Sequence, residues 1–395
     1  MDFVIMANAW TAAADNPTSK HQIAMELVRR GHRVLWVVGA GMRSPSLGSG
    51  ADRGRILRKL RQSIRPPERV PLEDMRSASG ALWVVAPLLI PLPKVALVRR
   101  LNGILFHGVT RFWAWRLTLA TPVLINYVPV LANVMRSWRG RAVYHCVDRW
   151  DQFAMYDRDL MRNMDAACRQ YADTVIATSR DLYDLCRADH GNVHLINHGV
   201  SFDHFASALQ GGEKTPPFPH RGGAVVGFFG LLSEWVDQDL IIALAKALPE
   251  ADVVLIGSAD VDVSALKAQS NIHVLGPMPF ADLPAAIAHF DVGIIPFVVN
   301  ELTRAVNPIK LREMLAAGCP VVSTALPEVS VYTESLPQAV RTAGSSEGFV
   351  EAVKAMLSAD ADPHAVSACM RSETWTAKVD EILNVIENTP SDGRP

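Results

Sequence analysis

The chain has few cysteines and lacks the spacings that bind metals or nucleotide phosphates. Its five cysteines are scattered and no two form a C-x-x-C pair, so we expect no disulfide framework, no zinc site and a reducing compartment. The phosphate loop G-x-x-x-x-G-K-[ST] and the dinucleotide fingerprint G-x-G-x-x-G are both missing. Their absence argues against an ATPase and against a dinucleotide-dependent enzyme.

No segment predicts a membrane span or a secretory leader. The longest apolar stretch, residues 81–92, is twelve residues long and contains two prolines, which is too short and too broken to cross a bilayer. The first residues carry no basic flank, and we therefore expect a cytoplasmic protein. With 49% hydrophobic and 20% charged residues over 395 positions, the chain is typical of a globular protein of two or three domains.

The net charge of −1 conceals an asymmetry between the two halves. Residues 1–200 hold 27 basic and 16 acidic residues, whereas residues 201–395 hold 12 and 24. The basic half predicts an anionic partner, which is a membrane surface, a nucleic acid or a phosphorylated substrate. Because no nucleic-acid recognition motif is present, we expect no nucleic-acid partner.

Two basic stretches favour an anionic membrane surface. On a helix, residues 52–69 place arginines on one face, and residues 97–119 mix arginine with aromatic residues. Such stretches suit a membrane interface; the alternative is a helix packed on a sheet with a solvated basic face. The residues concerned are Arg58, Arg61 and Arg65 in the first stretch, and Arg99, Arg100, Phe106, Arg111, Phe112, Trp113, Trp115 and Arg116 in the second.

Apolar runs that alternate with helical segments predict an α/β protein with parallel sheets. We divide it into a domain over 1–205, a linker over 206–223 and a domain over 224–370; a terminal helix over 371–388 is a candidate to pack back on the first domain. The expected strands are 3–6, 33–38, 82–86, 123–127, 142–147, 174–178 and 193–196 in the first domain, and 224–229, 253–256, 272–275, 292–296 and 321–323 in the second.

The most informative segment, residues 307–318, predicts a short helix between two strands. Asn307 suits the N-cap, the proline after it the first helical position, and Gly318 a left-handed stop. In such βαβ units, ligands lie beyond the carboxyl ends of the strands. Lys310 in the first turn and Glu313 on the same face suit a nucleotide diphosphate and sugar hydroxyls, or else form an ordinary surface ion pair.

Four further motifs accompany this helix: YHCVD from Tyr144, ADTVIATS from Ala172, INHGV from Ile196 and GFFG from Gly227. In this order and spacing they resemble the GT-B glycosyltransferases of the retaining type that builds bacterial surface polysaccharides. The resemblance covers nearly the whole chain. It implies an α/β fold of two Rossmann-like domains with parallel sheets facing a central cleft, with the donor in the C-terminal domain and the acceptor in the N-terminal one.

The resemblance also implies a set of donor-binding residues. Lys310 would bind the donor diphosphate, Glu313 would bind ribose or donor hydroxyls, and residues 300–306 would wrap the donor sugar with backbone amides. The remaining candidates are Gly230, Glu234, Trp235, Gly276, Pro277, Asn300, Thr303, Arg304 and Leu311.

The chain departs from the family pattern at two points. Residues 231–237 lack the Arg and Lys that many relatives carry after the position of Gly230, and Ala305 replaces the first of two glutamates. Arg304 then either assists Lys310 or is a solvated loop charge, and Trp235 either stacks on the ligand or packs.

Three polar residues near the end of a predicted strand are the catalytic candidates: His145, Asp148 and Asp151. Carboxylates at the carboxyl end of a strand suit an active site. Asp148 is the first candidate, as a base or as an electrostatic stabiliser, and its alternative is an N-cap. His145 is otherwise a sheet residue, and Asp151 is a second choice.

The sequence therefore favours a glycosyltransferase that moves a sugar from a nucleotide-diphosphate donor to a lipid-linked or glycan acceptor. We expect it to use no metal or other cofactor and to lie peripherally on the inner face of the membrane. Two rival hypotheses are a non-catalytic GT-B subunit that scaffolds a glycan-assembly complex and a nucleotide-sugar epimerase of the same fold.

Overall fold

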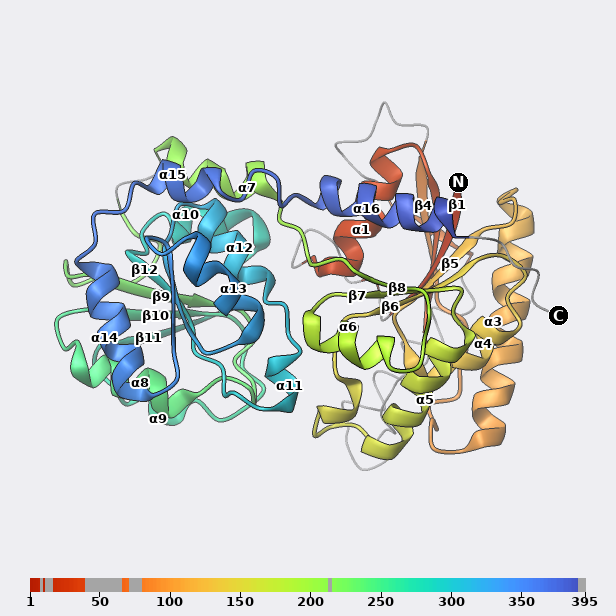
Figure 1. Cartoon of the computed structure of the whole chain (residues 1–395), viewed down its shortest axis with the longest axis horizontal. Coiled ribbons are helices and arrows are strands. Elements are labelled where there is room, and N and C mark those ends of the chain that lie inside the picture. Colours follow the sequence, from red (N-terminus) through yellow and green to blue (C-terminus); the bar gives the residue numbers. More distant parts are fainter. Residues whose placement is uncertain (8–9, 11–16, 40–65, 71–79, 212–214, 390–395) are drawn as a thin grey trace. The chain divides into compact units, whose positions relative to one another are not determined.

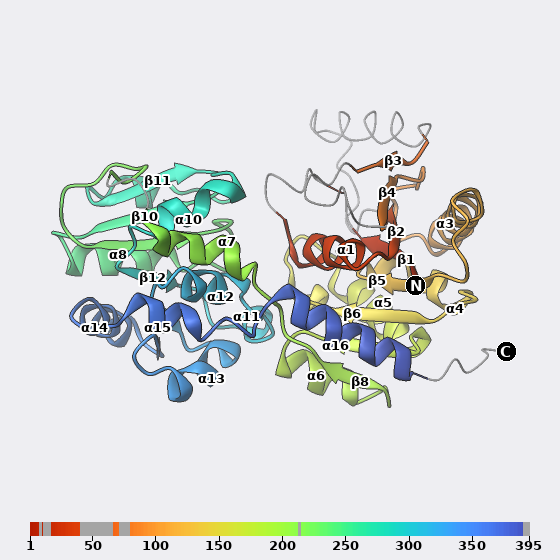
Figure 2. The ribbon, with the colours of Figure 1, turned by 90° about the horizontal axis from the view of Figure 1, so that it is seen from above.

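The protein is represented by a computed structural model that describes residues 1–7, 10, 17–39, 66–70, 80–211 and 215–389. They form two compact units, which Figure 1 shows and Figure 2 shows from above. The first unit runs to Asn197 and takes up the chain again from Val379, and the second comprises His198–Lys378. Of the helices in the described ranges, none is both long enough and apolar enough to span a bilayer.

The first unit is built on an eight-stranded sheet with the order β3-β4-β2-β1-β5-β6-β7-β8. Every neighbouring pair is parallel except β3 with β4. The chain adds strands on one side of β1 and then, from β5, on the other, so the winding reverses between β1 and β5. The strands are β1 (Asp2–Ala7), β2 (Arg33–Val38), β3 (Glu68–Arg69), β4 (Ala81–Val85), β5 (Val123–Asn126), β6 (Ala142–Cys146), β7 (Thr174–Ala177) and β8 (Val193–Leu195).

The second unit repeats this plan with a six-stranded, fully parallel sheet of order β11-β10-β9-β12-β13-β14. Here the winding reverses between β9 and β12. Such reversals are where open α/β sheets bind ligands, beyond the carboxyl ends of the strands. The strands are β9 (Val225–Phe229), β10 (Asp252–Ile256), β11 (Ile272–Gly276), β12 (Val292–Ile295), β13 (Val321–Thr324) and β14 (Val340–Ala343).

Helices cover the sheets because the strands are apolar on both faces. In the second unit α8 packs beside α14, while α12 packs beside α7 and α15 (Figure 1). The helices of the first unit are α1 (Ser19–Arg29), α3 (Ala96–Arg116), α4 (Ala132–Arg136), α5 (Arg158–Tyr171) and α6 (Arg180–Arg187). Those that follow are α7 (Phe202–Ala206), α8 (Gln238–Ala247), α9 (Ser264–Lys267), α10 (Leu283–Ile287), α11 (Glu301–Arg304), α12 (Ile309–Ala316), α13 (Pro327–Ser335), α14 (Ser346–Leu357), α15 (Pro363–Ala368) and α16 (Trp375–Asn388).

The last helix, α16, contributes to the first unit from Val379 onward. Asp380 forms an ion pair with Arg30 at the end of α1. The hydroxyl groups of Thr174 and Thr389 lie 2.7 Å apart and share a hydrogen bond.

The predicted α/β class with parallel sheets is confirmed, and most expected strands match an observed strand to within a residue or two. The expected strand over 33–38 coincides with β2. Two strands were not predicted: β3 has only two residues, and β14 has two adjacent polar residues between its apolar ends. Most of the predicted basic helix over 52–69, including Arg58, Arg61 and Arg65, lies outside the described residues.

Candidate functional site

Lys310 occupies the point of the second unit where the winding of the sheet reverses. It is the second residue of α12, and its Nζ lies 4.7 Å from the ring centroids of both Phe228 and Phe297. Phe228 is near the carboxyl end of β9, and Phe297 follows the carboxyl end of β12. The ammonium group is therefore held between the two strand ends where the fold predicts a ligand.

Burial shifts the pKa values of Lys310 and Glu313. It lowers the pKa of Lys310 to about 8, although the charge of Glu313 opposes the shift. It likewise raises the pKa of Glu313 to about 7 against the opposing charge of Lys310. Perturbed pKa values at a reversal of the winding are typical of a functional site. An anion bound beside Lys310 would replace the lost solvation of the ammonium group.

The start of α12 differs from the prediction. Asn307 is not the N-cap, because that position belongs to Pro308 and has no capping side chain. The Asn307 amide is instead buried: its Oδ1 accepts a hydrogen bond from Arg312 Nη1 at 2.8 Å, and its Nδ2 donates to Glu328 Oε2 at 2.7 Å. This buried network, which the sequence did not reveal, fixes the first turn that carries Lys310.

The end of α12 agrees with the prediction. Gly318 has φ +81°, and its N–H donates to the Leu315 carbonyl at 2.9 Å. The next N–H, of Cys319, donates to the Met314 carbonyl at 2.9 Å. This pair of bonds is the Schellman pattern, which favours glycine at the left-handed position.

Two glycines bring the backbone close to Lys310. Gly230 follows β9 with φ +130°, and a Cβ there would lie 2.9 Å from Lys310 Nζ. Gly257 follows β10 with φ +149°, and a Cβ there would lie 1.9 Å from the carbonyl oxygen of Gly230. Gly257 was not among the predicted site residues, although a glycine directly after a buried strand is a signal of close backbone approach.

Replacing Gly257 with alanine is expected to destabilise the second unit by about 2–4 kcal/mol, because φ is unfavourable for alanine and the methyl group displaces the backbone of Gly230. Urea unfolding measures the change. Gly344→Ala is the matched control, because no atom lies within 4 Å of its added methyl group. Equal unfolding midpoints for the two variants would contradict this account of the glycine pair.

The segment over 300–306 is not an open loop of free amides. It contains α11, and Asn300 is its N-cap. The Asn300 Oδ1 accepts hydrogen bonds from the N–H groups of Leu302 and Thr303, each at 3.0 Å. The Thr303 hydroxyl accepts from the Asn300 N–H at 3.0 Å. Three of the amides predicted to wrap the donor sugar are therefore occupied, and those of residues 304–306 donate to carbonyl groups within the same segment.

The remaining donor-site candidates differ in their surroundings. Trp235 is half-buried and packs against the core of the second unit. Gly276 has φ +80°, and its carbonyl accepts a hydrogen bond from the Gly257 N–H at 2.7 Å. Leu311 is fully buried. The exposed candidates are Glu234, Pro277 and Arg304.

A second cluster surrounds Asp148 in the first unit. Asp148 follows β6, and burial raises its pKa to about 6 against the opposing charge of Lys20. Lys20 lies in the first turn of α1, and its Nζ is 5.6 Å from the ring centroids of both Tyr127 and Trp150. Tyr127 follows β5, so this cluster also lies where the winding of its sheet reverses.

The alternative role of Asp148 as an N-cap is not observed, because Arg149 is the N-cap of the short 3-10 helix Trp150–Gln152. Lys20 was not among the predicted site residues. Its proximity to Asp148 depends on segments more than a hundred residues apart, and only its place in the first turn of the opening helix was visible. Burial lowers the pKa of Lys20, and Asp148 opposes that shift.

The other two catalytic candidates have different partners. His145 is buried in β6, where its Nδ1 shares a 2.9 Å hydrogen bond with the Tyr127 hydroxyl. Its Nε2 has no hydrogen-bond partner among the described residues. Burial, followed by the charge of Lys20, lowers the pKa of His145 to about 3. Burial alone would raise the pKa of Asp151, but hydrogen bonds and charge from Arg149 outweigh it and lower that pKa.

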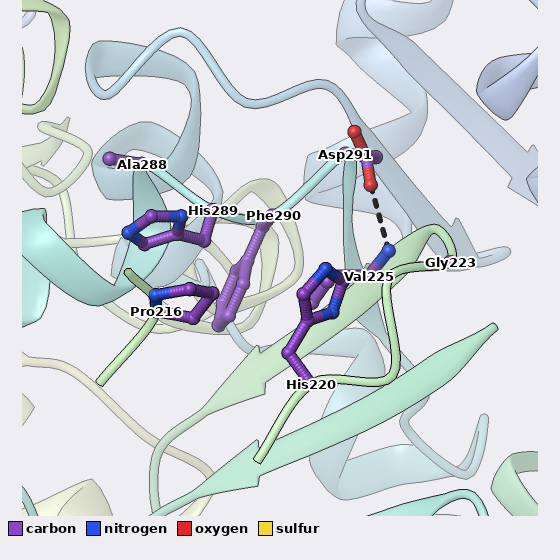
Figure 3. A pocket seen from close by; sticks show the side chains of 8 residues that line it. All are labelled: Pro216, His220, Gly223, Val225, Ala288, His289, Phe290 and Asp291. Carbon is purple, nitrogen blue, oxygen red and sulfur yellow. Dashed lines mark hydrogen bonds between the residues drawn. The ribbon is translucent and has the colours of Figure 1, made fainter. Parts of the chain in front are cut away.

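A surface hollow of about 300 Å³ lies at the opposite end of the second sheet. Figure 3 shows His220, His289 and Phe290 around it. The carboxylate of Asp291 accepts a 2.7 Å hydrogen bond from the Val225 N–H. Val225 begins β9 and Asp291 precedes β12, so the hollow is at the amino ends of the strands, away from the expected ligand position.

Comparison with known families defines the class of the second unit. Residues 223–359 match the family described as Glycosyl transferases group 1. This range contains Gly230, Gly257, Lys310 and Glu313. The second unit therefore carries a domain of this family, and the chain has the two parallel sheets of the GT-B glycosyltransferase structures.

Among curated proteins, the chain is similar to TuaH of Bacillus subtilis (strain 168), a protein named as a teichuronic acid biosynthesis glycosyltransferase, with 27% identity over 218 residues. The similarity covers 51% of this chain and 54% of TuaH, so the chain spans about half the length of that relative.

Two solved structures resemble the whole described fold. Sucrose-phosphate synthase from Thermosynechococcus elongatus aligns with a TM-score of 0.71 at 12% identity, over 98% of each chain. HepE of Anabaena, in complex with UDP and glucose, aligns with a TM-score of 0.60 at 15% identity, over 98% of this chain and 99% of HepE. At these identities the likeness shows the fold alone.

Proposed function

We propose that the protein is a glycosyltransferase that moves a sugar from a nucleotide-diphosphate donor to a lipid-linked or glycan acceptor. The observation that carries the proposal is the position of Lys310, a desolvated cation between the ends of β9 and β12 within the range that matches Glycosyl transferases group 1. The complex of HepE with UDP and glucose supports a nucleotide sugar as the ligand. The similarity to TuaH supports an acceptor in surface polysaccharide assembly.

In this proposal the second unit binds the donor. Lys310 stabilises the negative charge that grows on the departing diphosphate, and Glu313 accepts hydrogen bonds from hydroxyl groups of the donor. Gly230 keeps a side chain away from the ammonium group of Lys310, and Gly257 leaves room for the backbone of Gly230. Because the ammonium group and the N-terminus of α12 supply positive charge, the reaction requires no metal or other cofactor.

The first unit contributes the groups that act on the acceptor. Asp148 removes the proton from the acceptor hydroxyl or stabilises the positive charge at the sugar carbon. Lys20 keeps this buried carboxyl group ionised, since its charge lowers the pKa of Asp148. His145 positions Tyr127, and Asp151 positions Arg149. The protein then works at the cytoplasmic face of a membrane that holds the acceptor.

A thermal-shift screen with nucleotide diphosphates and nucleotide sugars tests the proposal. A specific donor at a concentration of about 100 times its dissociation constant stabilises the folded protein by about 2.7 kcal/mol, so the unfolding temperature should rise for one group of nucleotides. The best ligand is then supplied in labelled form with membrane extracts, and label should appear in an acceptor.

The outcomes separate the rival functions. Binding without transfer to any extract would favour a non-catalytic subunit, and conversion of the sugar without an acceptor would favour an epimerase. If no nucleotide or nucleotide sugar raises the unfolding temperature, the assignment of the second unit as the donor site is wrong.

A further inference from the structure

Helix α3 turns large apolar side chains toward solvent. Leu97, Ile104 and Trp115 have exposed fractions of 65%, 60% and 71%. Residues of these types are usually buried or half-buried, and a group of them on one element marks an interaction surface. Figures 1 and 2 both show α3 at the outer edge of the first unit.

The exposed side chains form one stripe along the helix. Leu97, Leu101, Ile104, Leu105, Phe112 and Trp115 are all exposed, and at 3.6 residues per turn they fall within an arc of roughly 100°. The opposite side of α3 is the one that packs inward, through Asn102, Phe106 and Thr110. The helix is therefore amphipathic in an unusual sense: one face is buried in the protein, and a second apolar face has no cover in the described structure.

The segment before α3 extends the same surface. Leu88, Ile90 and Leu92 are exposed, and hydrogen bonds fix their backbone to the helix. Asn102 accepts from the Ile90 N–H and donates to the Ile90 carbonyl, each at 2.8 Å. Arg99 donates to the Pro93 carbonyl at 2.6 Å. We call the exposed apolar surface of residues 88–115 the docking face.

Charge distinguishes the docking face from an ordinary protein interface. Residues 86–120 contain five basic residues and no acidic residue. Arg100, Arg111 and Arg116 are exposed, and helical spacing puts the first two along one edge of the apolar stripe and the third along the other. If a second copy covered the face by two-fold symmetry, each arginine edge would meet arginines rather than acids.

We propose that the docking face lies on an anionic lipid bilayer, with α3 in the plane of the interface. The apolar stripe would enter the boundary between head groups and acyl chains, the aromatic side chains would lie at that depth, and the arginines would reach lipid phosphates. This inference goes beyond the proposed sugar transfer and does not depend on it, because lipid binding is measured without donor or acceptor.

Vesicle flotation of the full chain tests the apolar part. The wild type should float with vesicles of phosphatidylcholine and phosphatidylglycerol at low salt. The double substitution Ile104→Glu and Trp115→Glu should abolish flotation, because two charges would enter the apolar boundary. Both side chains point outward, so the unfolding temperature should not change. Val331→Glu is the matched control, since Val331 is 66% exposed on a helix of the second unit, and it should float like the wild type.

A second pair of variants tests the charged edges. Arg100→Glu combined with Arg111→Glu should lower the vesicle partition coefficient by roughly 30-fold or more. A salt concentration of about 1 M should weaken the binding of the wild type to vesicles, because salt screens the charges. Arg341→Glu, on an exposed residue of the second unit, should have no effect. Wild-type protein that does not float at low salt overturns the proposal. The proposal is also overturned if the wild type is a dimer that the double substitution Ile104→Glu and Trp115→Glu dissociates, and if neither the wild type nor the variant binds lipid.

Discussion

Replacing Lys310 with methionine is expected to weaken the binding of the nucleotide-sugar donor by roughly 10- to 150-fold, equivalent to about 1.5–3 kcal/mol. Methionine retains the apolar stem that lies near the rings of Phe228 and Phe297 but cannot donate to a diphosphate. The loss of donor affinity should therefore come from the missing charge, and the stability of the second unit should change little. Titration calorimetry with the ligand identified by thermal shift measures the difference.

The matched control is Lys246→Met, which removes an exposed lysine from α8 and should leave the affinity unchanged. The wild-type affinity should also fall as the pH rises above about 8, because burial lowers the pKa of Lys310 to about 8 and only the protonated form attracts the diphosphate. In Lys310→Met this part of the pH dependence should disappear. Equal donor affinities for the wild type and the variant would remove Lys310 from the site.

Asp148→Asn is expected to lower turnover by roughly 100- to 10,000-fold while leaving the donor affinity nearly unchanged. Asparagine preserves the shape of the side chain but can neither accept a proton nor supply negative charge. The comparison is Asp159→Asn, which alters an exposed carboxylate in the first unit. Near wild-type turnover of Asp148→Asn with saturating acceptor would rule out a catalytic role.

The pH profile gives an independent test of the same cluster. Burial raises the pKa of Asp148 to about 6, and the positive charge of Lys20 opposes that rise. If the carboxylate is the active form, activity should fall as the pH drops through about 6. Lys20→Gln removes the opposing charge, so the pKa of Asp148 should increase and the acid limb should move to higher pH. If the acid limb does not move, the charge of Lys20 does not affect the pKa of Asp148.

The fold was largely predictable because the strands are buried on both faces. Continuous apolar runs mark such strands, and β2 was found at its expected residues. β14 was missed because Arg341 and Thr342 interrupt its apolar pattern, which gives a run too short and too polar to recognise without its neighbours.

Helix ends show where local signals fail. Asn300 and Asn307 are the same residue type before two neighbouring helices, yet only Asn300 caps its helix. Asn300 is exposed and keeps its amide for the local N–H groups. Asn307 is buried beside Arg312 and Glu328, and those tertiary partners outweigh the local preference. Partners of this kind lie in other segments and are not visible in a single sequence.

The candidate sites were predictable only in part for the same reason. Lys310 and Glu313 stood out because one helical turn carries both. Lys20 and Gly257 act through residues distant in the chain, namely Asp148 and Gly230. The sequence also left open whether the stretch over 97–119 packs on a sheet or faces outward. In the structure one side of α3 is buried, with α4 as a neighbour, and the other side is exposed.

The return of α16 to the first unit sets an order for folding during synthesis. Val379, Ile382 and Ile386 are buried within that unit, but the ribosome makes them only after the whole of His198–Lys378. At 5–20 residues per second this interval lasts roughly 10–40 s. The second unit, which is continuous in sequence, is complete before then. The first unit is begun first and finished last, and its surface for α16 stays open to chaperones until α16 emerges.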